Sequence, residues 1–404
     1  MAEEQTPPVP QTSDIDYGLL FPFMAHVVLL QAMILIVRIT TSYRAIELGL
    51  PVFWLGISAT GFAIIPVFSA VRLGRWIDRG NDARAIWIGN VLIFAACIGF
   101  WLWPRSGLHL VGLSVLLGFG HMFCMAGHQM LMVRVGGPPS RESVLGYYMI
   151  AASIGQGAGP LVVGWLGGSA ALPPTGPLFA IGLALAAVSL VVALLIKAAR
   201  NVPGAGKDDA LIPIGALLHK PGLPAIFIAS IVTVTAIDLL VIYMPALGAE
   251  RHIDSNHIGL LLTVRSAASL VSRIFYSRMI FAFGRAPLTL VSMLVSAAAF
   301  AVLALPLSLP AIYAVMIVLG FGMGIASTLT LSGVVFLAPK EAYGTALTLR
   351  MTGNRIGQVV FPALAGVVAA ATGVAGIFLI IGLSIGASGV AVPLSLRAIG
   401  GGDT

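Results

Sequence analysis

The sequence predicts an all-helical integral membrane protein with about twelve transmembrane helices in two pseudo-symmetric six-helix bundles. Hydrophobic residues make up 58% of the chain and charged residues only 9%, whereas soluble domains hold roughly 45–50% and 25%. The apolar residues gather into runs near the length of about 20 residues that crosses a bilayer as a helix. One long polar stretch divides these runs near the middle of the chain.

The first bundle is expected at residues 19–197. Residues 1–18 hold four acidic and no basic side chains, the opposite of a cleavable signal peptide, so they are read as an N-terminal tail before a retained helix. The apolar runs of this bundle lie at 19–46, 52–73, 85–103, 108–133, 144–166 and 178–196.

The second bundle is expected at residues 222–396, after a polar linker at 198–221. Residues 397–404 then form a short C-terminal tail. The apolar runs of this bundle lie at 223–246, 258–280, 288–305, 311–337, 343–369 and 375–392.

Lysine and arginine are distributed unevenly between the two sides of the predicted bundles. If the N-terminus is cytoplasmic, fourteen of them fall on that side, against chiefly three on the other, Arg44, Arg105 and Arg251. Basic loops tend to stay in the cytoplasm, so both termini are predicted to be cytoplasmic in a plasma membrane, of the bacterial inner-membrane kind.

The two halves also show weak internal similarity, of the sort that places one transport site between two repeats. Chance similarity among glycine-rich apolar segments is the alternative. The matching pairs are Glu47 with Glu250, Gly56 with Gly259, Thr60 with Thr263, Arg75 with Arg278, Pro160 with Pro362 and Gly164 with Gly366.

The loop after the second run reads GRWIDRGNDAR over residues 74–84. It resembles the signature Gly-x-x-x-Asp-Arg/Lys-x-Gly-Arg-Arg/Lys of the major facilitator superfamily. Gly74, Asp78 and Arg79 match in place, while Gly80 and Arg84 stand in displaced positions. The resemblance implies the twelve-helix fold of that family and a gating role for Gly74, Asp78 and Arg79.

The fifth run carries Gly146, Gly155, Gly159, Pro160 and Gly164 at the spacing of a motif found in proton-coupled exporters of that superfamily. Small residues allow close helix packing and proline bends a helix, so Gly155, Gly159 and Pro160 are candidate gating residues. Generic glycine packing is the alternative, because a valine replaces one glycine of the motif.

Ionisable residues inside the predicted spans are few, and each needs a partner, a wet cavity or a function. Those identified are Arg38, Asp238, Arg265, Arg350 and Arg355. The excess of arginine predicts an anionic substrate, because a guanidinium binds carboxylate or phosphate bidentately. The candidate substrate-binding residues are Arg38, Gln31, Arg265, Arg355 and Asn354.

Asp238 is the candidate proton carrier, because a buried carboxyl near arginine allows substrate binding and protonation to compete. A structural salt bridge with Arg265 or Arg38 is the alternative. A rival interpretation concerns soft ligands on one face of the fourth run, which suit Cu(I). These are His121, Cys124, Met125, His128 and Met132.

The prediction is therefore a monomeric secondary transporter, not an enzyme, that moves a small organic and anionic solute with protons by alternating access. A drug/proton exporter, a Cu(I) transporter and a non-transporting membrane sensor remain alternatives. No phosphate-binding Gly-x-x-x-x-Gly-Lys-Ser/Thr sequence occurs, which disfavours a primary pump. No cofactor or nucleic-acid partner is expected.

Overall fold

A computed structural model describes residues 15–102, 104–135, 141–196, 214–339 and 343–400. Within these residues every extended regular element is a helix. The predicted tail at 1–18 lies mostly outside the described residues, as does most of the predicted linker at 198–221. The all-helical prediction is confirmed.

The first half contains six long helices and one short π-helical turn. They are α1 (Tyr17–Glu47), α2 (Phe53–Trp76), η1 (Ile77–Asn81), α3 (Asp82–Leu102), α4 (Gly107–Val135), α5 (Arg141–Gly167) and α6 (Thr175–Leu195). The side chain of Asp16 caps α1 by accepting a hydrogen bond from the Leu19 amide at 3.2 Å, which satisfies one of the unpaired donors of the first turn. All six predicted spans of this half correspond to helices.

The second half begins with a short helix, α7 (Ile214–Leu218), that falls inside the predicted linker. The long helices that follow are α8 (Leu223–Glu250), α9 (Ser255–Phe283), α10 (Arg285–Leu303), α11 (Leu309–Leu337) and α12 (Tyr343–Gly400). The 58-residue α12 contains the last two predicted spans, joined at Gly373, where φ is 73°. It continues to Gly400, so the predicted tail at 397–404 begins as helix.

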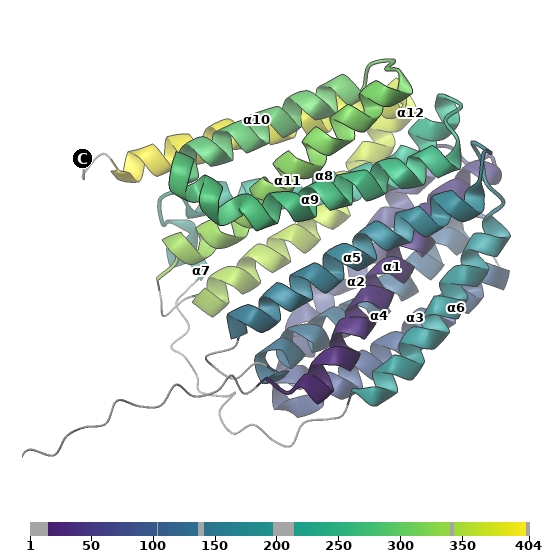
Figure 1. The fold of residues 1–404 in the computed structure, drawn as a ribbon, viewed down its shortest axis with the longest axis horizontal. Coiled ribbons are helices and arrows are strands. Elements are labelled where there is room, and N and C mark those ends of the chain that lie inside the picture. Colours follow the sequence, from purple (N-terminus) through teal and green to yellow (C-terminus); the bar gives the residue numbers. More distant parts are fainter. Residues whose placement is uncertain (1–14, 103, 136–140, 197–213, 340–342, 401–404) are drawn as a thin grey trace, which may run out of the picture.

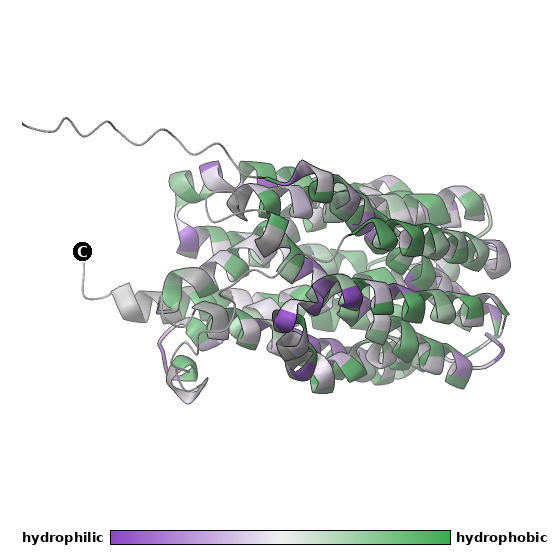
Figure 2. Cartoon of the chain, turned by 90° about the horizontal axis from the view of Figure 1, so that it is seen from below, coloured by the Kyte–Doolittle hydropathy of each residue, from purple (hydrophilic) through white to green (hydrophobic). Residues whose placement is uncertain are grey.

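Helix length and surface composition both suit a bilayer. Ten helices of the described residues are long and apolar enough to cross a membrane, α12 among them, and the apolar part of α2, Phe53–Ser69, is shorter. Large apolar side chains are exposed along the outside, as at Phe281 (94%) and Trp165 (76%), and much of the helical ribbon carries the colour of hydrophobic residues in Figure 2. Because such a surface is unfavourable in water, it is expected to face lipid.

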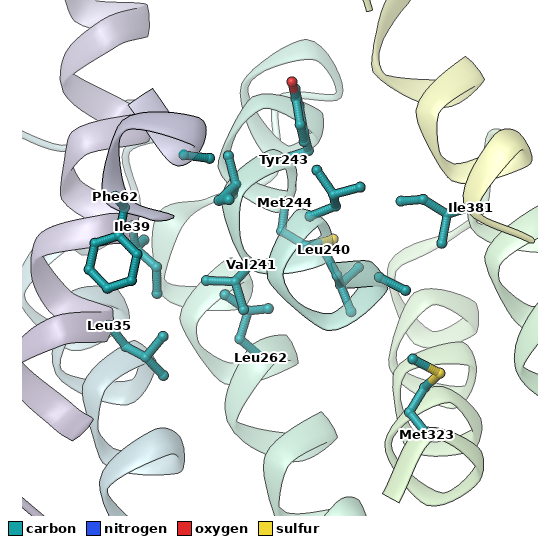
Figure 3. Close-up of a cluster of buried hydrophobic side chains, with 14 of the residues drawn as sticks. Leu35, Ile39, Phe62, Leu240, Val241, Tyr243, Met244, Leu262, Met323 and Ile381 are labelled. Atoms are coloured by element: carbon teal, nitrogen blue, oxygen red, sulfur yellow. The ribbon is translucent and has the colours of Figure 1, made fainter. Parts of the chain in front are cut away.

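The two halves lie side by side and meet along two seams (Figure 1). One seam joins α2 to the first part of α12, and the other joins α5 to α9. Between the seams, Leu35 and Phe62 of the first half approach Val241 and Leu262 of the second half in one buried cluster (Figure 3). The apolar core therefore continues from one bundle into the other.

The start of α1 and the end of α12 lie at the same end of the helical bundle, which is the left and lower side in Figure 1. This end is called the termini end below, and the opposite one the far end. Close contacts between the halves occur toward the far end, where Ser255 and Asn256 donate backbone hydrogen bonds to Ala170 and Gly168 at 2.9 and 3.1 Å. The ribbons of α5 and α9 draw apart toward the termini end in Figure 1.

Candidate functional site

An ion pair joins the two halves near the middle of the membrane-spanning region. The Nη1 atom of Arg38 on α1 lies 3.0 Å from Oδ1 of Asp238 on α8. The side chains are only 12% and 19% exposed. Of the two partners that the sequence allowed for Asp238, the structure selects Arg38.

Two further side chains on α12 extend this ion pair. Gln358 donates a hydrogen bond from Nε2 to the second carboxylate oxygen of Asp238, and Arg355 donates from Nη1 to Oε1 of Gln358 at 2.9 Å. Both oxygens of Asp238 are thus occupied, one by each half of the protein. Arg38, Asp238, Gln358 and Arg355 are called the central polar chain below.

Aromatic rings border the central polar chain on the side of the first half. The guanidinium of Arg38 lies 4.7 Å from the centre of the Phe62 ring, a cation–π contact that partly replaces lost hydration. The His121 ring lies 5.3 Å from the same ring, and its buried Nε2 has no hydrogen-bond partner. The sequence did not predict Phe62 as a site residue, because a single aromatic residue in an apolar run gives no indication that it contacts an arginine on another helix.

A small cavity adjoins Arg38 between α1, α2 and α4. Hydroxyl groups of Thr41, Ser42, Ser58 and Ser114 line it together with Arg38. The buried Oγ of Ser58 has no hydrogen-bond partner. Apolar residues, among them Leu55 and Leu117, complete the lining. An unsatisfied hydroxyl in a partly polar cavity is a suitable site for a water molecule.

Two largely buried arginines lie on α9, the second-half helix of the α5 seam. Arg265 donates from Nη2 to the hydroxyl of Ser266 at 3.0 Å, and Arg273 donates from Nη1 to Ser153 of α5 at 3.3 Å. The Nε atoms of both arginines are buried without a partner. Sequence analysis identified Arg265 but missed Arg273, although Arg273 lies inside the same predicted span.

The remaining candidate residues lie in other surroundings. Gln31 donates to the sulfur of Met125 at 3.7 Å, and Asn354 accepts a hydrogen bond from Ser230 at 3.0 Å. Arg350, one and a half turns before Arg355 on α12, has a buried Nε without a partner. Neither amide side chain has a recorded hydrogen bond to the central polar chain.

The side chains on α4 that were considered as Cu(I) ligands contact different neighbours. His128 bonds His26 at 2.8 Å, Cys124 lies 3.5 Å from the Asn90 amide, and Met125 accepts from Gln31. His121 instead lies beside Phe62, with the two rings tilted relative to each other. Within the described ranges, no three residues among His, Cys, Asp and Glu gather where they would hold a metal ion.

The glycine-rich motif of α5 packs on two different helices. A Cβ atom on Gly155 would lie 2.5 Å from the carbonyl oxygen of Val28, and one on Gly159 would lie 2.6 Å from that of Ala32. These two glycines therefore hold α5 against α1 inside the first half. One turn further on, Gly164 instead meets Gly259 of α9, where an added Cβ on Gly259 would lie 2.6 Å from the Gly164 Cα.

The second seam repeats this contact with pseudo-twofold symmetry. A Cβ on Gly56 of α2 would lie 3.0 Å from the Cα of Gly366 on α12. Hydrogen bonds repeat as well, because Thr60 donates to the carbonyl of Val359 at 2.9 Å and Thr263 donates to that of Gly157 at 3.0 Å. The paired glycines and threonines predicted from internal similarity thus lie at equivalent positions of the two seams.

The loop with the superfamily-like signature lies at the termini end, between α2 and α3. Gly74 belongs to the last turn of α2, and the chain then passes through the π-helical turn η1. Gly80 adopts φ 86°, and Arg79 is exposed. The side chain of Asp78 lies outside what the structure describes.

Comparison with known proteins agrees with this architecture. Among solved structures, a bacterial homologue of the human lysosomal transporter Spinster superposes with a TM-score of 0.74 at 13% identity, over 93% of this chain and 94% of that one. The nucleoside transporter NupG superposes with a TM-score of 0.76 at 14% identity, over 94% and 99%. A peptide transporter of the POT family gives 0.75 at 16% identity, over 94% of each chain.

These identities establish a shared fold and no more. A comparison with curated protein sequences finds no match. The sequence model of the Major Facilitator Superfamily, however, matches residues 15–250 and 226–399, which together make up nearly the whole chain. The chain therefore belongs to the Major Facilitator Superfamily and is a membrane transporter rather than an enzyme.

Proposed function

We propose that this protein is a proton-coupled symporter of a small organic anion. The observation that carries the proposal is the ion pair between Arg38 and Asp238, which joins the two halves in the membrane interior. A buried ion pair with one partner removed leaves a costly uncompensated charge. The pair is therefore sensitive to a proton that neutralises Asp238 and to an anion that takes the place of its carboxylate.

Protonation of Asp238 would favour anion binding at the same place. A neutral Asp238 no longer compensates the guanidinium of Arg38, so the two arginines of the central polar chain, Arg38 and Arg355, become available to a carboxylate or phosphate. Planar guanidinium groups bind such anions through paired hydrogen bonds. Proton and anion then bind together and support one another, which is the thermodynamic requirement of symport.

The charge balance favours an anion over a cation. Within the described residues, Asp238 pairs with Arg38 and interacts electrostatically with Arg265 and Arg355, while Arg273 is a further largely buried arginine. A cationic solute would add charge to this excess, whereas an anion would reduce it. Low polarity magnifies the difference, because Coulomb energies rise as the dielectric constant falls.

The arrangement of the seams suits one state of an alternating-access cycle. The close glycine contacts and threonine hydrogen bonds hold the halves together toward the far end. The basic loops favour a cytoplasmic location of the termini end, and with this orientation we propose that the structure is a cytoplasm-open state in a plasma membrane. The Spinster homologue of similar fold is likewise described as inward-facing.

Anion binding is tested first, by thermal unfolding of detergent-purified protein with monocarboxylates, dicarboxylates, sugar phosphates, lipophilic cations and Cu(I). A ligand at 100 times its dissociation constant stabilises the protein by about 2.7 kcal/mol. Stabilisation by anions that disappears in Arg355→Gln is expected. Stabilisation by cations or Cu(I) alone would overturn the anion proposal in favour of an exporter or a metal transporter.

Coupling is tested in proteoliposomes with the stabilising anion and the variant Asp238→Asn. An imposed proton gradient should drive accumulation in the wild type, whereas Asp238→Asn should keep exchange of internal for external anion and lose accumulation. Glu250→Gln, at the exposed end of the same helix, is the matched control and should accumulate normally. Accumulation by Asp238→Asn would contradict its role as proton carrier, and binding without any flux would identify a sensor.

A further inference from the structure

The pair Arg265 and Arg273 forms a second concentration of positive charge, separate from the central polar chain. The two residues lie eight positions apart on α9, about 12 Å along the helix axis. Arg265 is within electrostatic reach of both Asp238 and Arg273. Arg265 thus interacts electrostatically both with a member of the central polar chain and with Arg273.

Both arginines lie deep in the bundle. Each is ten residues from one end of α9, which runs from Ser255 to Phe283, or about 15 Å from that end at the usual rise per residue. Both α-carbons thus fall within about 6 Å of the middle of the helix. An ionised side chain at this depth is costly unless something compensates its charge.

The partners that the structure gives these arginines are neutral. The Ser266 hydroxyl donates its own hydrogen to Leu262 at 2.9 Å and the Ser153 hydroxyl donates to Met149 at 2.7 Å, so each oxygen accepts from an arginine. A hydroxyl oxygen satisfies one N–H group but does not neutralise the positive charge. Each guanidinium also keeps a buried Nε–H without any partner.

A single negative charge does not balance this arrangement. The ion pair with Asp238 compensates Arg38, and Arg355, Arg265 and Arg273 then remain positive. A monoanion bound by Arg38 and Arg355 after Asp238 is protonated would leave both arginines of α9 uncompensated. A second anionic group on the same solute would reduce this excess of positive charge and supply acceptors for the unpartnered N–H groups.

We infer that the transported solute is a dianion, held by one anionic group at Arg38 and Arg355 and by the other at Arg265 and Arg273. This inference rests on the proposed anion transport and specifies its substrate class. The second subsite has the unpartnered donors that an anionic oxygen requires, and Arg273 selects dianions over monoanions by adding a charge-assisted hydrogen bond.

The test is a chain-length-matched panel of succinate, glutarate and adipate against butyrate, valerate and hexanoate. Binding is measured by thermal unfolding and transport by counterflow in proteoliposomes. Wild-type protein should bind the best dicarboxylate about tenfold or more tightly than the monocarboxylate of equal length, in keeping with one added charged hydrogen bond. Arg273→Gln should weaken dicarboxylate binding more than monocarboxylate binding and should thereby remove this preference.

Two variants control the experiment. Arg278→Gln, exposed on the same helix, removes an equal charge away from the seam and should keep the preference. Arg273→Lys keeps the charge and should retain part of it, which guards against misfolding of the glutamine variant. Equal binding of both acid classes by wild type would overturn the dianion inference alone, as would an equal loss of both in Arg273→Gln. Binding of no carboxylate at all would overturn the proposed anion transport itself.

Discussion

The far-end seam between α5 and α9 gives a quantitative prediction for Gly259. A methyl group there would lie 2.4 Å from the Pro160 carbonyl oxygen and 2.6 Å from the Gly164 Cα, whereas ordinary contact begins at 3.4 Å, so the two helix backbones must separate by roughly 1 Å. Overpacking of this kind typically costs about 1–3 kcal/mol. The cost applies only while the seam is closed, so Gly259→Ala should shift the population toward the far-end-open state by about 5- to 150-fold.

Labelling of a single introduced cysteine measures that shift. Both natural cysteines, Cys97 and Cys124, are fully buried, so background labelling should be low. Ala59→Cys places a thiol beneath the closed far end, at a residue that is 7% exposed and lines the small cavity near Arg38. A membrane-impermeant thiol reagent added from the far side should react faster when Gly259→Ala is also present.

Gly146→Ala is the matched control on α5. An added Cβ at Gly146 meets no atom within 4 Å, and alanine has a higher helix propensity than glycine. The thiol of Ala59→Cys should be labelled at the same rate whether or not Gly146→Ala is also present. Gly146→Ala should unfold at the same temperature as the wild type or at a slightly higher one. Unchanged labelling in Gly259→Ala, or equal acceleration in both variants, would refute the assignment of the glycine contact as a far-end closure.

Three further predictions concern the seams, the buried network and the site. Thr60→Val and Thr263→Val should each weaken far-end closure by about 0.6 kcal/mol, the average for a hydrogen bond in a membrane protein. The two losses should add in the double variant because the seams are separate. Cysteine labelling measures the closure, and a non-additive result would contradict the prediction. Asn90→Leu should lower the free energy of unfolding by about 1–3 kcal/mol, because Asn90 forms hydrogen bonds with His26 at 2.7 Å and with Ser189 at 2.8 Å inside the first half. An unchanged unfolding temperature would show that these hydrogen bonds are dispensable. Phe62→Leu removes the cation–π contact of Arg38 and should change anion affinity by about 0.5–2 kcal/mol, as measured by thermal shift against the wild type.

Local sequence was sufficient to predict the fold class. A helix satisfies all its backbone groups within its own segment, so an apolar run of adequate length predicts a spanning helix without knowledge of its neighbours. The break between the last two predicted spans was also predictable, and Gly373 adopts a positive φ there. The short helix α7 was missed, because its five residues lie in a polar region without a long apolar pattern.

The sequence predicted which residues belong to the candidate site but not which of them contact one another. The rule that ionised groups inside a span need compensation identified Arg38, Asp238, Arg265 and Arg355, yet it left the salt-bridge partner of Asp238 open. Arg38 and Asp238 are 200 positions apart, and spacing on one helix says nothing about contacts across that separation. The roles of Gln358 and Arg273 depend on their contacts with Asp238 and Ser153 on other helices.

The sequence by itself therefore determined a twelve-span membrane transporter of two similar halves with an excess of buried arginine, because hydropathy and charge act locally along each helix. Only the tertiary structure decided that Arg38 pairs with Asp238, that Gln358 and Arg355 extend the pair, and that the glycine and threonine contacts close both seams toward the same end. The physical reason is that these contacts depend on the packing of α1 against α8, α2 against α12 and α5 against α9. Helix periodicity within one segment does not encode how two distant segments are placed against each other.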